Sequence, residues 1–371
     1  MANEKIKTVV GYSDTSSLED FINLTSSQGD PNKALGNTLY GINHRQIDAD
    51  LSTDRIRRGH IFFTRPQLNL TTSNIENFRS LYPLLSENET SISRFVRNTL
   101  DPRLHHKLVK TKTGNIGEVL QSPLVDPKNV FMPVLTNIAT SCTGWPDLVL
   151  PTYTTPNGVR KEQYSMVDGV AELFETFDLD VGFKNFKGEP ILQIMATWLL
   201  YMGATFEGIM SPYLDFIVER ELDYNTRIYE IAMDETGKYV KKIAATGASF
   251  PLNVPYGKFF DWTKDKTFQE GVKDFSIRFR CMGAIYNEDI LVKEFNDSVG
   301  IFHPGMRNLN KTLMKPGGVY TDNEVLKIPS NILEIFNYRG YPRIDPKTYE
   351  LEWWIDSDSK RLSNLLKRSG E

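Results

Sequence analysis

The chain has 371 residues, of which 40% are hydrophobic and 24% charged, and its formal net charge is −4. This length suits two or three domains with a sizeable core, and the charge balance gives no reason to expect a nucleic-acid or membrane partner. The first residues lack the apolar region of a signal peptide, and no apolar run approaches the ~20 residues of a membrane span. Only Cys142 and Cys281 are present, which excludes a disulfide framework and a cysteine metal site.

The N-terminal 160 residues divide into two parts. Residues 1–60 are polar without a sustained period, which predicts an extended arm. Residues 61–160 form a mixed region. Its expected elements are a strand at 60–64, a helix at 74–82 that ends before Pro83, and a helix carrying Ile92, Phe95 and Val96. Turn-forming residues gather at 151–158, and we interpret that loop as the boundary of the next domain.

The central part of the chain, 161–290, is predicted to be a compact β-rich unit. Two strands alternate strictly between apolar and polar residues, at 177–184 and 275–281. Their polar positions are Asp178, Asp180 and Lys184 in the first strand, and Ser276, Arg278 and Arg280 in the second. Between them lies a hairpin, with strands at 226–233 and 239–245 joined by a turn at 234–237.

An amphipathic helix follows the first of these strands. Pro190 suits its first turn and Gly203 suits the position just past its end. Apolar residues recur at helical spacing around Trp198. We expect Trp198 to be buried against the apolar sheet face, which is formed by Leu179, Val181, Ile277 and Phe279.

The remaining residues, 291–371, are expected to form a C-terminal extension. A short helix at 288–295 leads into it, and residues 311–340 are rich in loops. The chain closes with a strand at 349–355 and a last helix carrying Leu362, Leu365 and Leu366.

No motif of a catalytic, cofactor or metal site is present. The chain lacks a phosphate-binding glycine loop, a nucleophile elbow and a zinc-binding histidine motif. Asp178 and Asp180 share a strand face about 7 Å apart, within the range of glycosidase acid pairs. The other interpretation is charge complementarity with Arg278 and Arg280 on a neighbouring strand, and we favour it. We therefore predict no catalytic residue, cofactor or metal.

The central unit resembles the tail-tube fold of bacteriophages with contractile tails. The resemblance covers about 173–286 and rests on element order together with one short motif. The order is strand, helix with a central Trp, hairpin and return strand, and the motif occupies Gly247, Ala248, Phe250, Pro251, Asp261 and Trp262. In the family, a Gly-Ala-Phe-Pro-like turn stands at the first four positions. The resemblance implies an α+β, mainly β fold, a tube-like sandwich or barrel with one packed helix and extensions at both ends.

The resemblance also implies a structural role in the virion tail, after assembly in the host cytoplasm. Subunits would form a ring, hexameric by likeness to the family, whose sheets join around a channel that DNA crosses in transit. Asp178, Asp180, Lys184, Arg278 and Arg280 would then face the lumen. The region after the helix would contact a neighbouring subunit through Tyr213, Phe216 and Ile217; the alternative is a lid over its own domain.

The long flanking regions favour a baseplate or tube-initiating protein that also contacts unlike tail proteins. Two alternatives stay open. One is the major tail tube protein, and the other, of a different class, is a carbohydrate-active tail enzyme that uses Asp178 and Asp180.

Overall fold

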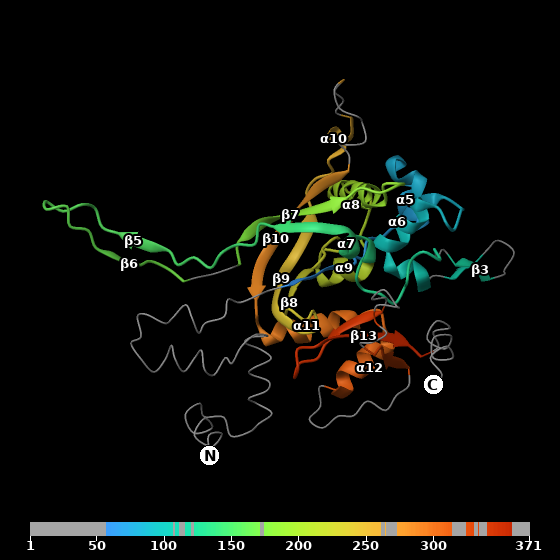
Figure 1. The fold of residues 1–371 in the computed structure, drawn as a ribbon. Coiled ribbons are helices and arrows are strands. Elements are labelled where there is room, and N and C mark those ends of the chain that lie inside the picture. Colours follow the sequence, from blue (N-terminus) through green and yellow to red (C-terminus); the bar gives the residue numbers. More distant parts are fainter. Residues whose placement is uncertain are drawn as a thin grey trace, which may run out of the picture. The chain divides into compact units, whose positions relative to one another are not determined.

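The computed structural model describes residues 57–106, 108–110, 116–119, 122–170, 174–260, 264, 273–313, 324–329, 333 and 340–357. These residues form two compact units. The sheet unit comprises 61–229 and 245–285, and the C-terminal unit comprises 57–60, 230–244 and the described part of 286–357. The fold is mixed α and β around a curled antiparallel sheet of six strands (Figure 1), which confirms the predicted fold class.

The six-stranded sheet has the order β1-β8-β9-β10-β7-β4. Its strands are β1 (Arg57–Phe63), β4 (Ala139–Thr143), β7 (Thr176–Lys184), β8 (Ile228–Met233), β9 (Val240–Pro251) and β10 (Asp274–Tyr286). The strands predicted at 177–184 and 275–281 correspond to β7 and β10, which pair antiparallel with Val181 opposite Ile277. Burial alternates along both strands because successive side chains point to opposite faces of the sheet.

Strand β9 corrects one expectation. The sequence predicts that the chain turns at 247–251, but these residues continue β9 to Pro251. Gly247 is needed for another reason, the close approach of the adjacent strand: a Cβ there would lie 2.7 Å from the backbone oxygen of Met282.

Helix α8 (Pro190–Phe206) covers the apolar face of the sheet. Trp198 has no exposed surface and lies in one hydrophobic cluster with Leu179, Val181, Ile277 and Phe279. Its indole N–H donates to the carbonyl of Tyr224 at 3.0 Å, which satisfies the one polar group that the ring carries into the core.

The end of α8 lies further along the chain than the sequence predicts. Gly203 is a helical residue, and the helix continues to Phe206. The chain leaves the helix at Gly208, whose φ of +73° is a left-handed conformation that glycine adopts without a steric penalty. Backbone N–H groups of Gly208 and Ile209 then donate to Thr205 and Ala204 and close the last turn.

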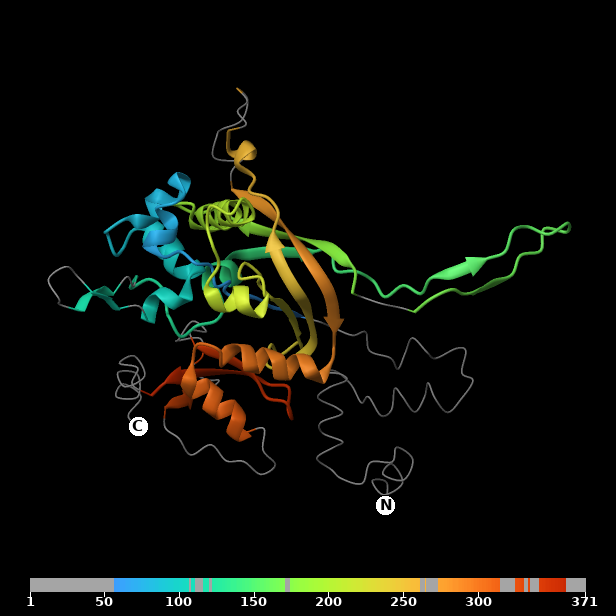
Figure 2. The same ribbon diagram turned by 180° about the vertical axis from the view of Figure 1, so that it is seen from behind.

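The N-terminal elements of the sheet unit share the core of α8 and the sheet. They are α5 (Thr72–Ile75), η1 (Arg79–Leu85), α6 (Ile92–Leu100) and α7 (Pro133–Ile138), while the 3₁₀ helix η2 (Pro102–His106) follows α6 in the chain. Leu68, Leu70, Ile75 and Leu100 belong to the same hydrophobic cluster as Trp198. In both views α5 and α6 lie on the same side of the sheet as α8 (Figures 1 and 2).

Two details of this region differ from the prediction. The single helix expected at 74–82 is divided into α5 and the 3₁₀ helix η1, which contains Pro83. Strand β1 begins at Arg57, so residues 57–60 belong to a strand and not to the predicted arm.

Two hairpins lie outside the main sheet. One pairs β2 (Leu108–Lys110) with β3 (Ile116–Val119). The other pairs β5 (Thr152–Thr154) with β6 (Ser165–Val167) and projects from the ends of β4 and β7 (Figure 1). The second hairpin includes the loop 151–158, which the sequence indicates as a domain boundary. Residues 61–160 and 161–229 lie in the same compact unit.

The C-terminal unit has a core of its own. Helices α11 (Asp289–Val299) and α12 (Pro304–Leu313) accompany a three-stranded sheet of order β11-β13-β12. Its strands are β11 (Val325–Lys327), β12 (Tyr341–Ile344) and β13 (Leu351–Asp356). The sequence predicts α11 and β13, whereas α12 was not expected. The predicted arm at 1–56, Asp261, Trp262 and the last helix carrying Leu362, Leu365 and Leu366 lie outside the described residues.

Candidate functional site

The polar face of β7 and β10 carries a ladder of opposed charges. Arg278 Nε lies 3.1 Å from Asp180 Oδ1, and Arg280 Nε lies 2.9 Å from Asp178 Oδ1. Lys184 stands opposite Asp274 in the same register, and Ser276 stands opposite Gly182. The structure thus brings all the predicted polar-face residues together. The face carries three acidic and three basic side chains, so its charge is compensated.

This face is open to solvent. The side chains of Arg278 and Asp180 are 53% and 47% exposed, and those of Arg280 and Asp178 are 40% and 31% exposed. Both carboxylates are engaged by arginines of the neighbouring strand. A glycosidase pair instead needs one acid that holds its proton. The geometry therefore matches cross-strand charge pairing, which is the interpretation favoured over a glycosidase acid pair in the sequence analysis.

A second candidate surface is the segment with α9 (Leu214–Glu219). Two of the three residues predicted to contact a neighbour are directed at their own unit. Tyr213 donates its hydroxyl to Asp101, and Phe216 is buried. The guanidinium of Arg103 lies over both rings, 4.7 and 4.9 Å from their centroids, and its Nη2 pairs with Asp215 at 2.7 Å.

The outward face of α9 is apolar. Ile217, the third predicted residue, is 52% exposed, while Leu214 and Val218 are 75% and 71% exposed. These residues stand at i, i+3 and i+4, so they form one stripe on the helix. The contacts of Tyr213, Asp215 and Phe216 hold the opposite side of α9 on its own unit, which fixes the direction of this apolar stripe.

The third candidate is the hairpin that carries β5 and β6. We call it the arm (residues 147–170); it is distinct from the N-terminal arm predicted at residues 1–60. Nearly every arm residue is exposed. Its large apolar side chains with more than two fifths of their surface exposed are Leu148, Val149, Leu150, Tyr153, Val159, Tyr164, Met166, Val167 and Val170. So much exposed apolar surface on one projecting element indicates a contact with another molecule.

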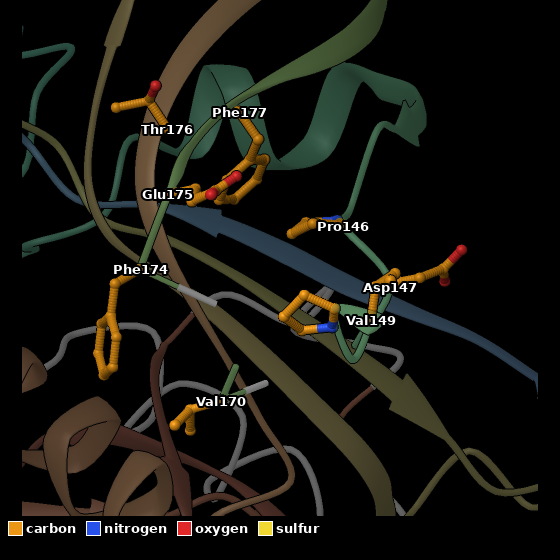
Figure 3. Close-up of a pocket in the computed structure, with 9 residues that line it drawn as sticks. Pro146, Asp147, Val149, Val170, Phe174, Glu175, Thr176 and Phe177 are labelled. Carbon is orange, nitrogen blue, oxygen red and sulfur yellow. The ribbon is translucent and has the colours of Figure 1, made fainter. Parts of the chain in front are cut away.

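A hollow of about 590 Å³ lies where the arm joins the sheet. Its lining includes Val149, Val170, Phe174 and Phe177, together with two acids, Asp147 and Glu175. Figure 3 shows Glu175 and Phe177 directed toward Pro146, while the carboxylate of Asp147 points away from the hollow. The site is thus an apolar cleft with acidic groups at its margin, and the part of its lining that the structure describes contains no basic side chain.

Comparison with known families decides the identity of the chain. Residues 2–370 match the model of a family described as "Putative phage tail tube protein". The chain belongs to this family. It is therefore a structural component of a phage tail, and the predicted resemblance is confirmed.

Three solved structures are similar to parts of this tail tube protein. The cap that terminates the tube of the anti-feeding prophage is 15% identical, with a TM-score of 0.26, over 41% of this chain and 81% of that one. The PVC sheath/tube terminator of an extracellular contractile injection system, in its extended state, is 12% identical, with a TM-score of 0.23, over 41% of this chain and 87% of that one. The sheath–tube complex of the same system is 14% identical, with a TM-score of 0.23, over 43% and 82%. No curated protein matches the chain.

The tail tube protein also contains a buried polar network, which the sequence did not indicate. Asp101 has no exposed surface and accepts hydrogen bonds from Leu70 N, Arg103 N and the Tyr213 hydroxyl. Nearby, the Tyr201 hydroxyl donates to Asp223. Burial raises the pKa of Asp223 to about 6, although the hydrogen bond from Tyr201 lowers it. These contacts join the helical segments to the insertion that carries α9.

Within the described part of the chain, no three His, Cys, Asp or Glu side chains are grouped so that they could hold a metal ion. Among the same residues, no helix is long and apolar enough to cross a bilayer.

Proposed function

We propose that this tail tube protein forms a ring around a central channel at the junction of baseplate and tail tube, where it seeds or continues the tube. The observation that carries the proposal is the division of the sheet into two unlike faces. One face is buried under α8 and the N-terminal helices. The other is exposed and carries opposed, compensated charges.

A compensated polar face suits the wall of a channel that DNA crosses. Each contact between a phosphate and a Lys or Arg side chain adds salt-dependent affinity, and a strongly basic wall would hold the DNA. Here Asp178 and Asp180 occupy the two arginines that would otherwise bind phosphates. We therefore place Asp178, Asp180, Lys184, Arg278 and Arg280 in the lumen of the ring, and we expect six subunits.

The lateral contact is expected at α9. Its exposed stripe of Leu214, Ile217 and Val218 is held in a fixed direction by the contacts of Tyr213 and Phe216 on the opposite side. A second copy of the chain is the partner that a ring requires. Tyr213 and Phe216 then support this contact from within, and Ile217 makes it.

The baseplate location rests on the C-terminal unit. This unit has its own helices and its own sheet, and it adds a surface beyond what a repeating tube subunit needs. We propose that it binds an unlike tail protein. The major tail tube protein is the alternative, and the family description fits both roles. Quantitative mass spectrometry of the virion separates them, since one ring requires about six copies and a tube requires many rings.

The ring is tested with the purified full-length protein. We expect rings with a central channel by negative-stain microscopy and a matching mass by light scattering. Replacing Leu214, Ile217 and Val218 together by Ser should leave folded monomers that no longer assemble. The matched control replaces Leu124, Ile290 and Ile301, which are exposed to a similar degree, and should still form rings. Monomers of the unaltered protein at all concentrations would contradict the proposal.

The enzyme hypothesis is tested in the same preparation. A tail enzyme that uses Asp178 and Asp180 would release reducing ends from host surface polysaccharide. We expect no release, because both carboxylates are paired with arginines. Release that is lost on replacing Asp178 by Asn would support catalysis.

A further inference from the structure

The tip of the arm is a fixed turn that presents one apolar side chain and two cations. Gly158 N donates to the Glu162 carbonyl at 2.9 Å, and Lys161 N donates to the Gly158 carbonyl at 2.9 Å. Arg160 N donates to the Glu162 carboxylate at 2.7 Å. Val159 is fully exposed, and Arg160 and Lys161 follow it directly in the sequence. An isolated apolar residue held outward in this way makes no contact that stabilises its own hairpin.

The hollow at the root of the arm has the complementary character. Val149, Val170, Phe174 and Phe177 give it an apolar surface, and Glu175, directed toward Pro146, supplies a negative charge; Asp147 supplies another at the margin, with its carboxylate pointing outward. Its volume of about 590 Å³ accommodates a side chain such as Val159 with the apolar stems of its neighbours. Polarity and charge are therefore complementary between the two ends of the same arm.

The two ends of one arm cannot meet. Extended chain rises about 3.3 Å per residue, so the eight steps from Thr152 to Arg160 hold the tip about 26 Å from the root. The paired strands β5 and β6 keep the hairpin extended, with Tyr153 opposite Met166. A tip that enters a hollow of this kind must enter the hollow of another copy.

We propose that the arm tip of one subunit docks into the hollow at the arm root of a second copy of this chain. Val159 enters the apolar cleft, while Arg160 and Lys161 face Asp147 and Glu175. The contact is heterologous, with different surfaces on the two copies, and repeated contacts of this kind close into a ring or continue as a stack. The inference deepens the proposed ring function and rests on it for the assembled state.

Cysteine cross-linking tests this contact in the full-length chain. In a background with Cys142→Ser, one preparation carries Val159→Cys and a second carries Val170→Cys. Under mild oxidation, we expect a disulfide-linked dimer when the two preparations are mixed and none when either is oxidised alone. A matched control pairs Val159→Cys with Ile290→Cys, at an exposed position of α11, and should stay unlinked.

Charge reversal provides an independent measurement. Replacing Arg160 and Lys161 by Glu should lower ring yield about tenfold, as the loss of two exposed charge pairs predicts. Adding Asp147→Lys and Glu175→Lys in the same chain should restore the yield. Reversal of Lys293, an exposed charge on α11, should leave the yield unchanged.

The outcomes separate the two proposals. Rings that form without the mixed cross-link would overturn the tip-to-root contact and leave the ring intact. A mixed cross-link in a protein that forms no rings would keep the contact and overturn the ring. A cross-link within the Val159→Cys preparation alone would show that tips meet tips, which contradicts the proposed contact.

Discussion

The Tyr213 hydroxyl donates a hydrogen bond of 2.7 Å to Asp101 Oδ2, although 112 residues of sequence separate the two. Asp101 follows α6, and Tyr213 precedes α9, so this bond holds the α9 segment on the N-terminal helices. Burial, reinforced by the nearby Asp101 carboxylate, raises the pKa of Tyr213, and the hydroxyl remains a donor throughout the neutral range.

Replacing Tyr213 by Phe tests this bond. The variant removes one hydrogen-bond donor to a fully buried carboxylate, and we expect a loss of about 1–2 kcal/mol in the free energy of unfolding. Denaturant melts measure the loss. Tyr82→Phe is the matched control, because the Tyr82 hydroxyl donates to Glu76 at an exposed site. Equal effects of the two variants would contradict a structural role for the Asp101 contact.

Trp198 is expected to dominate the core contact of α8. Replacing this fully buried side chain by Ala should lower the free energy of unfolding by about 3–5 kcal/mol, through lost burial and the cavity left behind. Leu200→Ala, on the same helix at 40% exposure, should have an effect below about 1 kcal/mol. A loss near zero for Trp198→Ala would mean that the helix does not depend on this packing.

Asp223 gives the fold a specific pH dependence. Its pKa in the folded state, about 6, lies above the ordinary value of 3.8, mainly because of burial. The folded state therefore binds this proton more tightly, and the contribution of Asp223 to stability rises as pH falls from about 6 to about 4. The full difference corresponds to about 3 kcal/mol.

Replacing Asp223 by Asn removes this dependence and keeps an oxygen that can accept the Tyr201 hydrogen bond. We expect the stability advantage of the variant to be largest at pH 7 and to shrink toward pH 4. Unfolding curves at both pH values measure it. Asp297→Asn, at an exposed position of α11, should show no such trend. A constant difference between variant and unaltered protein across this range would contradict the raised pKa.

The sequence predicts those strands and helices in which one face is buried and the other is exposed to solvent. Strands β7 and β10 alternate because their sheet has a helix-covered face, and Trp198 follows from the same pattern. The arm could not be predicted in this way. Thr152, Tyr153 and Thr154 are all exposed, so burial imposes no alternation on them. The Pro and Gly residues around them predict only a loop.

Polar contacts between residues far apart in the chain also could not be predicted from the sequence. Arg65 is buried and donates to the carbonyls of Thr99 and Asn129, but the sequence around Arg65 does not indicate those acceptors.

The candidate site could likewise be predicted only in part. The charge ladder follows from the register of two alternating strands, whereas the inward contacts of Tyr213 and Phe216 depend on Asp101 and Arg103, more than 100 residues away.

The last prediction concerns the charge of the proposed lumen. Replacing Asp178 and Asp180 by Asn leaves Arg278 and Arg280 without their acidic partners, and the ring repeats this excess in every subunit. Subunit stability should change little, because solvent-exposed ion pairs contribute little to the free energy of unfolding. Assembled rings should bind double-stranded DNA more tightly, and each new phosphate contact should steepen the dependence of log affinity on log salt by about 0.9. Rings with Arg278→Gln and Arg280→Gln are the control and should show no such gain. Unchanged DNA binding by the Asn variant would place this face away from the channel, even if the ring itself forms.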